Sequence, residues 1–112
     1  MVNYKSVVKA LIDEAKKNDY LLEILNDGEE SRFVRSDEKM TDICNNATST
    51  DMAKLTFVSP FHKNARFTVF LVFGNNLDET IADHTFTEDA EKICNSVIQH
   101  FNPDFQPIAF FQ

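Results

Sequence analysis

Acidic side chains and one histidine gather in residues 71–92, LVFGNNLDETIADHTFTEDAEK, directly after a very apolar run. The segment holds six carboxylates, and Asp83 stands beside His84. A carboxylate next to a histidine can work as an acid–base pair, and three nearby acids can hold a hard cation. The segment has neither an EF-hand spacing nor an HExxH motif nor a nucleophile elbow. We therefore interpret it as a partner-binding surface, with no metal or cofactor, made by Asp78, Glu79, Asp83, His84, Glu88 and Asp89.

Part of this acidity also has a structural explanation. Thr87 is suited to cap a helix, and Thr85 with Glu88 forms an alternative capping box. Glu88 and Asp89 then fall in the first helical turn, where each carboxylate contributes about 0.3–1 kcal/mol through the helix dipole. The segment therefore combines a helix start with a charged surface.

Charge is distributed unevenly along the chain. The net charge is −7, but residues 1–66 hold eleven acids against ten bases, whereas residues 67–112 hold seven acids against one base. A large basic footprint is absent, which argues against direct binding of nucleic acid. The acidic last third instead favours a partner that offers a basic surface, such as the nucleic-acid-binding surface of another protein.

The cysteines and glycines exclude several other chemistries. Cys44 and Cys94 are single residues on apolar helical stripes, so we expect buried thiols and neither a zinc site nor a dithiol redox pair. The chain has only two glycines, too few for a phosphate-cradling loop or a dinucleotide fingerprint.

Three segments have the apolar spacing of amphipathic helices. The first runs over residues 3–17 and ends with two lysines. The second is short and can be capped by Ser36 or Asp37, with Met40, Ile43, Cys44 and Ala47 on its apolar stripe. The third ends at Asn102-Pro103, and its stripe comprises Ala90, Ile93, Cys94, Val97, Ile98 and Phe101.

The remaining apolar runs indicate strands. Residues 20–26 read either as an extension of the first helix or as a strand; we favour a strand because Asn26-Asp27-Gly28 is a strong hairpin turn. That strand places Tyr20, Leu22 and Ile24 on one face and returns at residues 33–34. A second hairpin joins residues 53–59 to residues 65–74, and a short extended piece at residues 80–82 can follow. The strand at residues 65–74 is apolar on both faces, so we expect a helix, the C-terminal tail or another subunit to cover its second face.

Together these elements predict one α+β domain over residues 1–112. The expected order is α-β-β-α-β-β-α, with an antiparallel four-stranded sheet, built from two hairpins, that helices cover. Residues 103–112 form an apolar tail, and exposure of a large apolar side chain costs about 1.5–3 kcal/mol. The tail therefore either docks on its own sheet or makes a dimer or partner contact, and the residues concerned are Phe105, Ile108, Phe110 and Phe111.

The chain also lacks the signals of export or membrane insertion. Its first residues are amphipathic and contain no continuous apolar core of a signal peptide. No run approaches the roughly 18–20 apolar residues of a membrane span. We expect a cytoplasmic protein.

Short pieces of the sequence resemble small uncharacterised proteins encoded in phage genomes. The pieces are DGEE (27–30), RSD (35–37), STDxxxL (49–55), VFGN (72–75) and DETIAD (78–83). The resemblance implies a phage or prophage origin, and so a place in the host cytoplasm. Small phage proteins of this size often act by binding a host factor, whereas the resemblance implies no catalytic activity.

Three functions are compatible with these observations. The first is a non-catalytic inhibitor that docks its acidic surface on a host protein such as a defence nuclease complex. The second is a self-associating scaffold module, in which the two-faced strand and the tail make the contact. The third is a small enzyme that uses Asp83 and His84.

Overall fold

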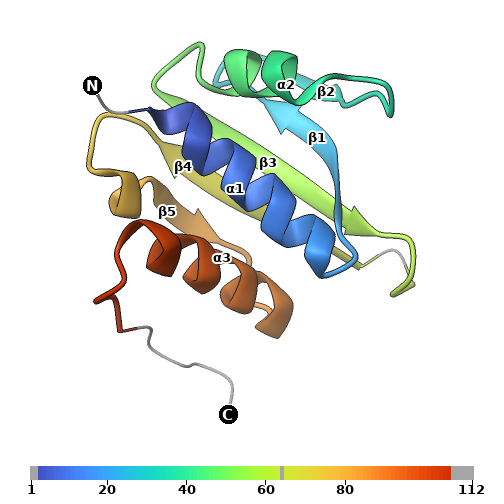
Figure 1. The fold of residues 1–112 in the computed structure, drawn as a ribbon. Helices are drawn as coiled ribbons and strands as arrows, with labels where there is room; N and C mark the ends of the chain where they lie inside the picture. Colours follow the sequence, from blue (N-terminus) through green and yellow to red (C-terminus); the bar gives the residue numbers. More distant parts are fainter. Residues whose placement is uncertain (1–2, 64, 107–112) are drawn as a thin grey trace.

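The computed structural model describes residues 3–63 and 65–106. Figure 1 shows an α+β fold in which helices lie against one antiparallel sheet. The elements are α1 (Tyr4–Lys17), β1 (Leu21–Asn26), β2 (Ser31–Phe33), α2 (Met40–Ala47), β3 (Met52–Ser59), β4 (Ala65–Val72), the 3-10 helix η1 (Leu77–Glu79), β5 (Ile81–His84) and α3 (Glu88–Phe101).

The sheet has five strands in the order β2-β1-β3-β4-β5, and every neighbouring pair is antiparallel. The prediction of four strands in the order α-β-β-α-β-β-α was therefore wrong in number and order. The additional strand is β5, which contains the end of the short extended piece expected at residues 80–82. Its sequence IADH has one large apolar residue, so its strand character depends on pairing with β4 and not on an apolar pattern.

The first helix begins and ends as its sequence predicts. The Asn3 side chain accepts a hydrogen bond from the backbone N–H of Lys5, and Lys16 and Lys17 lie in the last turn. Asp19 then has a positive φ of 67°, a left-handed conformation that Asp tolerates better than most residues. The reversal brings Tyr20 back onto the core, where it is only 4% exposed.

Residues 20–26 form a strand and not a helical extension. Gly28 has a φ of 97° in the β1–β2 turn, and the Asp27 carboxylate accepts the backbone N–H groups of Glu29 and Glu30. The predicted alternation is broken, however, by a register shift between Leu22 and Ile24. Leu22 pairs with buried Phe57, whereas Ile24 pairs with Thr56 on the opposite face.

The other two helices keep their predicted apolar stripes. Ile43, Cys44 and Ala47 are buried in α2, although its N-cap is Lys39 and not Ser36 or Asp37. In α3 the Thr87 hydroxyl accepts the Ala90 N–H at 3.3 Å, as a capping residue should.

All three helices lie on one face of the sheet. Strands β3 and β4 alternate strictly, so Leu55, Phe57, Val69 and Leu71 face the helices and are fully buried. No element of residues 3–63 and 65–106 packs on the opposite face, which we call the open face. Its side chains on β3 and β4 are Met52, Lys54, Thr56, Val58, Arg66, Thr68, Phe70 and Val72.

Of the three covers expected for the second face of the strand at residues 65–74, a helix is not found within the described residues. Most of the C-terminal tail lies outside those residues, and the cover by another subunit stays a prediction. Also within that part of the chain, no helix combines the length and the apolar character that crossing a membrane requires.

Candidate functional site

The acidic segment is divided between the two ends of α3. Asp78 lies in η1, and its carboxylate accepts a hydrogen bond from the Asn102 side-chain amide at 3.1 Å, just past the last turn of α3. Glu79 accepts a hydrogen bond from Asn76 at 2.9 Å. Both carboxylates therefore hold the loop that follows β4.

Glu88 and Asp89 lie at the other end of α3, in its first turn. The helix has 14 residues, which separates its ends by about 21 Å. The Tyr20 hydroxyl donates a hydrogen bond to Asp89 at 2.8 Å. Burial and this hydrogen bond raise the pKa of Tyr20 to about 12. Asp89 thus ties the start of α3 to the connection between α1 and β1, and Glu88 remains exposed beside it.

Asp83 and His84 lie on the edge strand β5 and do not form a carboxylate–imidazole pair with each other. The Asp83 carboxylate accepts the backbone N–H of His84 at 2.9 Å, and His84 Nδ1 lies 2.9 Å from the Thr85 carbonyl oxygen. A carbonyl oxygen can only accept, so Nδ1 carries the proton in this contact and Nε2 is the basic nitrogen. Among the described residues, no group of three or more His, Cys, Asp or Glu side chains is placed to hold a metal ion.

Two exposed phenylalanines lie at the same end of the molecule as the start of α3. Phe61 in the β3–β4 turn is 74% exposed and Phe86, between β5 and α3, is 64% exposed. Figure 1 shows that this turn and the start of α3 lie at the same end, away from η1. We call this surface the aromatic–acidic end and define it by Phe61, Phe86, Glu88, Asp89 and Asp19.

Tyr20 connects the parts of the aromatic–acidic end. Its ring centroid lies 6.4 Å from that of His62 in the β3–β4 turn, while its hydroxyl bonds to Asp89 on α3. His62 Nε2 in turn lies 3.9 Å from the Asp19 carboxylate. The Phe86 ring lies 5.5 Å from the His84 ring, so one predicted partner-binding residue contacts this end through an aromatic side chain.

Neither Phe61 nor Phe86 was among the site residues predicted from the sequence. Phe86 stands alone between two threonines in a polar segment, and Phe61 follows Pro60 in a turn. Neither residue fits a helical or a strand period, and a large apolar residue outside any period is itself a signal of surface exposure.

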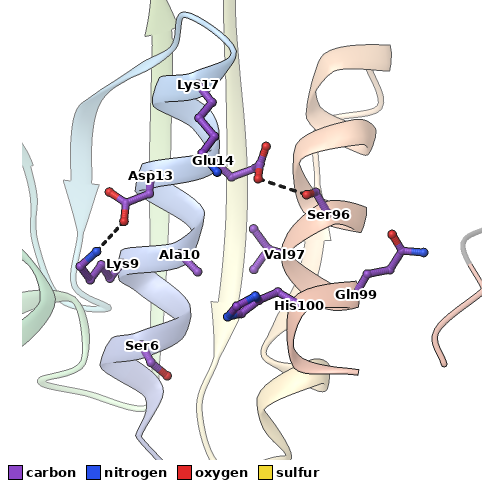
Figure 2. Close-up of a pocket in the computed structure, with 10 residues that line it drawn as sticks. All are labelled: Ser6, Lys9, Ala10, Asp13, Glu14, Lys17, Ser96, Val97, Gln99 and His100. Carbon is purple, nitrogen blue, oxygen red and sulfur yellow. Dashed lines mark hydrogen bonds and ion pairs between the residues drawn. The ribbon is translucent and has the colours of Figure 1, made fainter. Parts of the chain in front are cut away.

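A groove of about 550 Å³ runs between α1 and α3 on the helical side, and Figure 2 shows ten residues that line it. Within it, Lys9 Nζ and the Asp13 carboxylate are 2.6 Å apart, and Ser96 donates a hydrogen bond to Glu14 at 3.1 Å. The Lys9–Asp13 pair is an exposed pair within α1, whereas the Ser96–Glu14 hydrogen bond joins α3 to α1.

Both cysteines are buried free thiols, as predicted. Cys44 is 5% exposed and Cys94 is 0% exposed. Burial raises the pKa of both thiols, that of Cys94 to about 12. Ionisation, the step that makes a thiol reactive, is therefore suppressed.

The predicted tail contact falls mostly outside the described residues, where Ile108, Phe110 and Phe111 lie. Phe105 is described and is partly buried; its carbonyl oxygen accepts a hydrogen bond from Gln99 at 3.3 Å. The chain beyond α3 thus begins by turning back on that helix.

No protein-family model matches this chain, and comparison with curated proteins and with solved structures finds no match. Function has to be inferred from the residues and their geometry.

Proposed function

We propose that this protein is a non-catalytic binding protein that docks its aromatic–acidic end on a basic surface of another protein. The observation that carries the proposal is the joint exposure of Phe61 and Phe86 beside the carboxylates at the start of α3.

Exposed aromatic side chains of this kind suit the centre of an interface. Burial of a phenylalanine contributes about 1.5–3 kcal/mol, and aromatic residues are enriched where interfaces are fully desolvated. Phe61 and Phe86 come from segments far apart in the sequence, so tertiary structure, and not local sequence, puts them at one end. They would supply the affinity of the contact.

The carboxylates define the chemistry of the partner. Glu88, Asp89 and Asp19 lie at the same end of the molecule as the phenylalanines. Residues 67–112 carry seven acids against one base. Carboxylates at the rim of an interface speed encounter with a basic surface and reject acidic ones. Lys63 in the β3–β4 turn makes that side less acidic, so the partner's cations are expected to face the start of α3.

A phage-encoded inhibitor of a host nuclease complex, present in the host cytoplasm, is the concrete form of this proposal. Nucleases that bind nucleic acid present clustered Lys and Arg residues. Occupation of such a surface by the carboxylates of α3 would block substrate without any reaction. The resemblance of residues 27–83 to small phage-encoded proteins motivates this choice of partner.

Quantitative affinity capture from a bacterial lysate tests the proposal, followed by titration of the purified partner. The test variants are Phe86→Ser, which removes an aromatic anchor, and Glu88→Gln, which removes a charge without touching the Tyr20–Asp89 bond. We expect at least tenfold weaker binding for the first, and a slower association with a shallower salt dependence for the second.

Matched control variants change the same chemistry elsewhere on the molecule. Glu79→Gln removes a carboxylate at the η1 end, and Phe33→Ser removes an exposed phenylalanine from β2. Both are expected to bind like the unmodified chain. Equal binding by all four variants, or binding to a partner with an acidic surface, would rule the proposal out.

A further inference from the structure

The open face of the sheet carries a projecting side chain near one edge and a shallow hollow near the other. Phe33 projects from it at the β2 edge and is 73% exposed. Near the opposite edge lies a shallow hollow of about 490 Å³, lined by Lys54, Thr68, Phe70, Asp83, His84 and Thr85. A protruding aromatic ring and a hollow of suitable size thus lie on one face.

Strand register places this projection and this hollow at the same height along the strands. Phe33 pairs with Ile24, Ile24 with Thr56, and Thr56 with Thr68. The N–H of Thr85 donates to the Thr68 carbonyl at 3.0 Å, which continues the same row onto the end of β5. Phe33 and Thr85 are therefore the two ends of one row that crosses the sheet.

A two-fold axis along the central strand exchanges the two ends of such a row. The order β2-β1-β3-β4-β5 is centred on β3. Rotation by 180° about an axis that runs along β3, in the plane of contact, puts β2 of one copy over β5 of the other and preserves height along the strands. Phe33 of each copy then faces the hollow at Thr85 of the other.

We propose that the open face is the contact surface of a homodimer in which a second copy of this chain packs face to face. The sheets then lie about 10 Å apart with their strands roughly aligned.

The charges on this face support a second copy. Arg66 on β4 and Glu23 on β1 form an ion pair at 2.9 Å within one chain. The same axis puts β1 over β4, so each Glu23 faces the Arg66 of the other copy as well. Lys54 on β3 would face its own counterpart, but its ammonium leans over the Phe70 ring, 5.9 Å from the centroid, and so away from the axis.

The central residues can be buried in such a contact. The hydroxyls of Thr56 and Thr68 lie 3.0 Å apart and hydrogen-bond to each other, which lowers the cost of removing them from water. Ile24, Val58 and Phe70 surround them with apolar surface that is half-buried in the single chain.

The size of the face predicts a weak dimer. Strands β3 and β4 have eight residues each in a five-stranded sheet, so the face measures about 26 by 24 Å at its widest. This approaches the lower end of the roughly 600–1,000 Å² that each partner buries in a standard interface. We expect a dissociation constant in the micromolar range and not an obligate dimer.

Sedimentation velocity of the full chain over a wide concentration range tests the proposal. We expect a monomer–dimer equilibrium that Phe33→Glu weakens at least tenfold, because the variant removes the aromatic ring from the contact and requires a charged carboxylate to be buried there. Phe33 is exposed on a short edge strand, so the variant should fold; circular dichroism and the melting temperature verify this. Lys92→Glu, which places a new carboxylate on the exposed side of α3 and away from the open face, should leave the equilibrium unchanged.

Cross-linking tests the axis itself. Phe33 and Thr85 of one chain are about 19 Å apart across four strand spacings, whereas in the dimer their Cα atoms face each other at about 10 Å. The double variant F33C/T85C with a short bismaleimide should therefore give covalent dimers. The unmodified chain, with its buried thiols, and K92C/T85C, whose first cysteine lies on the exposed side of α3, should not.

Several results would overturn this proposal. A chain that stays monomeric at every concentration excludes a homodimer. A dimer insensitive to Phe33→Glu that also resists cross-linking uses another face. If deletion of residues 107–112 abolishes the dimer while Phe33→Glu does not, the tail makes the contact and not the open face.

Discussion

At the scale of single residues, several charged side chains prove to have structural partners that spacing did not indicate. Arg32 on β2 donates to Glu38 at 2.5 Å and to Asn46 on α2 at 2.9 Å. Asn46 donates in turn to Asp27 in the β1–β2 turn at 3.1 Å. Hydrogen bonds from Arg32 and from the Arg35 backbone lower the pKa of Glu38 in spite of its burial. This network attaches α2 to the first hairpin.

Ionisation of Cys94 is expected to lower the stability of the fold at alkaline pH. Its thiol has a pKa of about 12 in the folded protein and about 8.5 in an unfolded chain. The unfolded state therefore loses its proton first as the pH rises. We expect the contribution of Cys94 to the free energy of unfolding to be constant below about pH 8. Between about pH 9 and 12, Cys94 should lower the free energy of unfolding by up to about 1.4 kcal/mol per pH unit.

Urea unfolding of the unmodified chain and of Cys94→Ala between pH 7 and 10 measures this effect. The alanine variant is less stable throughout because it loses buried volume, but its stability should fall less steeply above pH 9. The raised pKa of Tyr20 acts in the same direction above pH 10, so the comparison stays below that value. Parallel curves for the two proteins would contradict the assignment.

At the scale of elements, the structure differs from the prediction where a strand is irregular, as at the register shift in β1. The apolar alternation at residues 20–24 placed Ile24 with Tyr20 and Leu22. The register shift after Leu22 moves Ile24 to the open face, because an extra residue in one strand reverses the orientation of every side chain beyond it.

The β1–β2 turn depends on a glycine with little space around it. Gly28 has a φ of 97°, and a Cβ at this position would lie 2.4 Å from Thr50 Oγ1 and 3.0 Å from the Met52 carbonyl oxygen. Thr50 is held in place by hydrogen bonds to the carbonyls of Asp27 and Met52. We expect Gly28→Ala to lower the free energy of unfolding by about 2–4 kcal/mol through backbone strain and the clash together.

Gly74→Ala is the matched control for this prediction. Gly74 also has a positive φ, of 124°, but no atom lies within 4 Å of its ideal Cβ. The Gly74→Ala variant should lose about 1–2 kcal/mol of its free energy of unfolding, through backbone strain alone. Chemical denaturation compares the two variants, and equal losses would mean that Thr50 gives way without cost.

At the scale of the whole molecule, the one-sided covering of the sheet is the main feature. The helices bury one face and leave the other to be half-buried or exposed. The open face is the surface on which the proposed self-association depends, whereas the proposed contact with a different partner uses the aromatic–acidic end.

The covered face and the open face of the sheet should contribute differently to stability. Substitution of one phenylalanine on each face, on two adjacent strands, tests this. Phe57 on β3 faces the helices, is 0% exposed and stacks on Phe67 with centroids 5.0 Å apart. We expect Phe57→Ala to cost about 3–5 kcal/mol. Phe70→Ala on the open face of β4 should cost less than half as much, because its ring is only partly buried among the described residues.

Thermal and urea unfolding at low protein concentration, where a weak dimer dissociates, provide this comparison. Equal losses for the two variants would show that the second face is covered within the monomer. At high concentration, the loss for Phe70→Ala should grow if a second copy covers the ring.

The class of fold was largely determined by the sequence. Apolar periods of helical and strand type, capping at Thr87 and the turn at Asn26-Asp27-Gly28 predicted the three helices, the first four strands and the buried cysteines. These signals are local, since each arises from how a short segment buries one face and satisfies its own backbone.

Tertiary structure alone decided the fifth strand, the face of Ile24 and the position of each carboxylate. The polar segment IADH becomes β5 because β4 offers it a free edge, and α3 separates Asp78 from Asp89 because a helix of its length lies between them. The segments that carry Phe61 and Phe86 lie at one end of the molecule because of the same tertiary arrangement. Contacts between segments far apart in the sequence leave no periodic trace in either segment, so only the assembled sheet and helices determine which side chains share a surface.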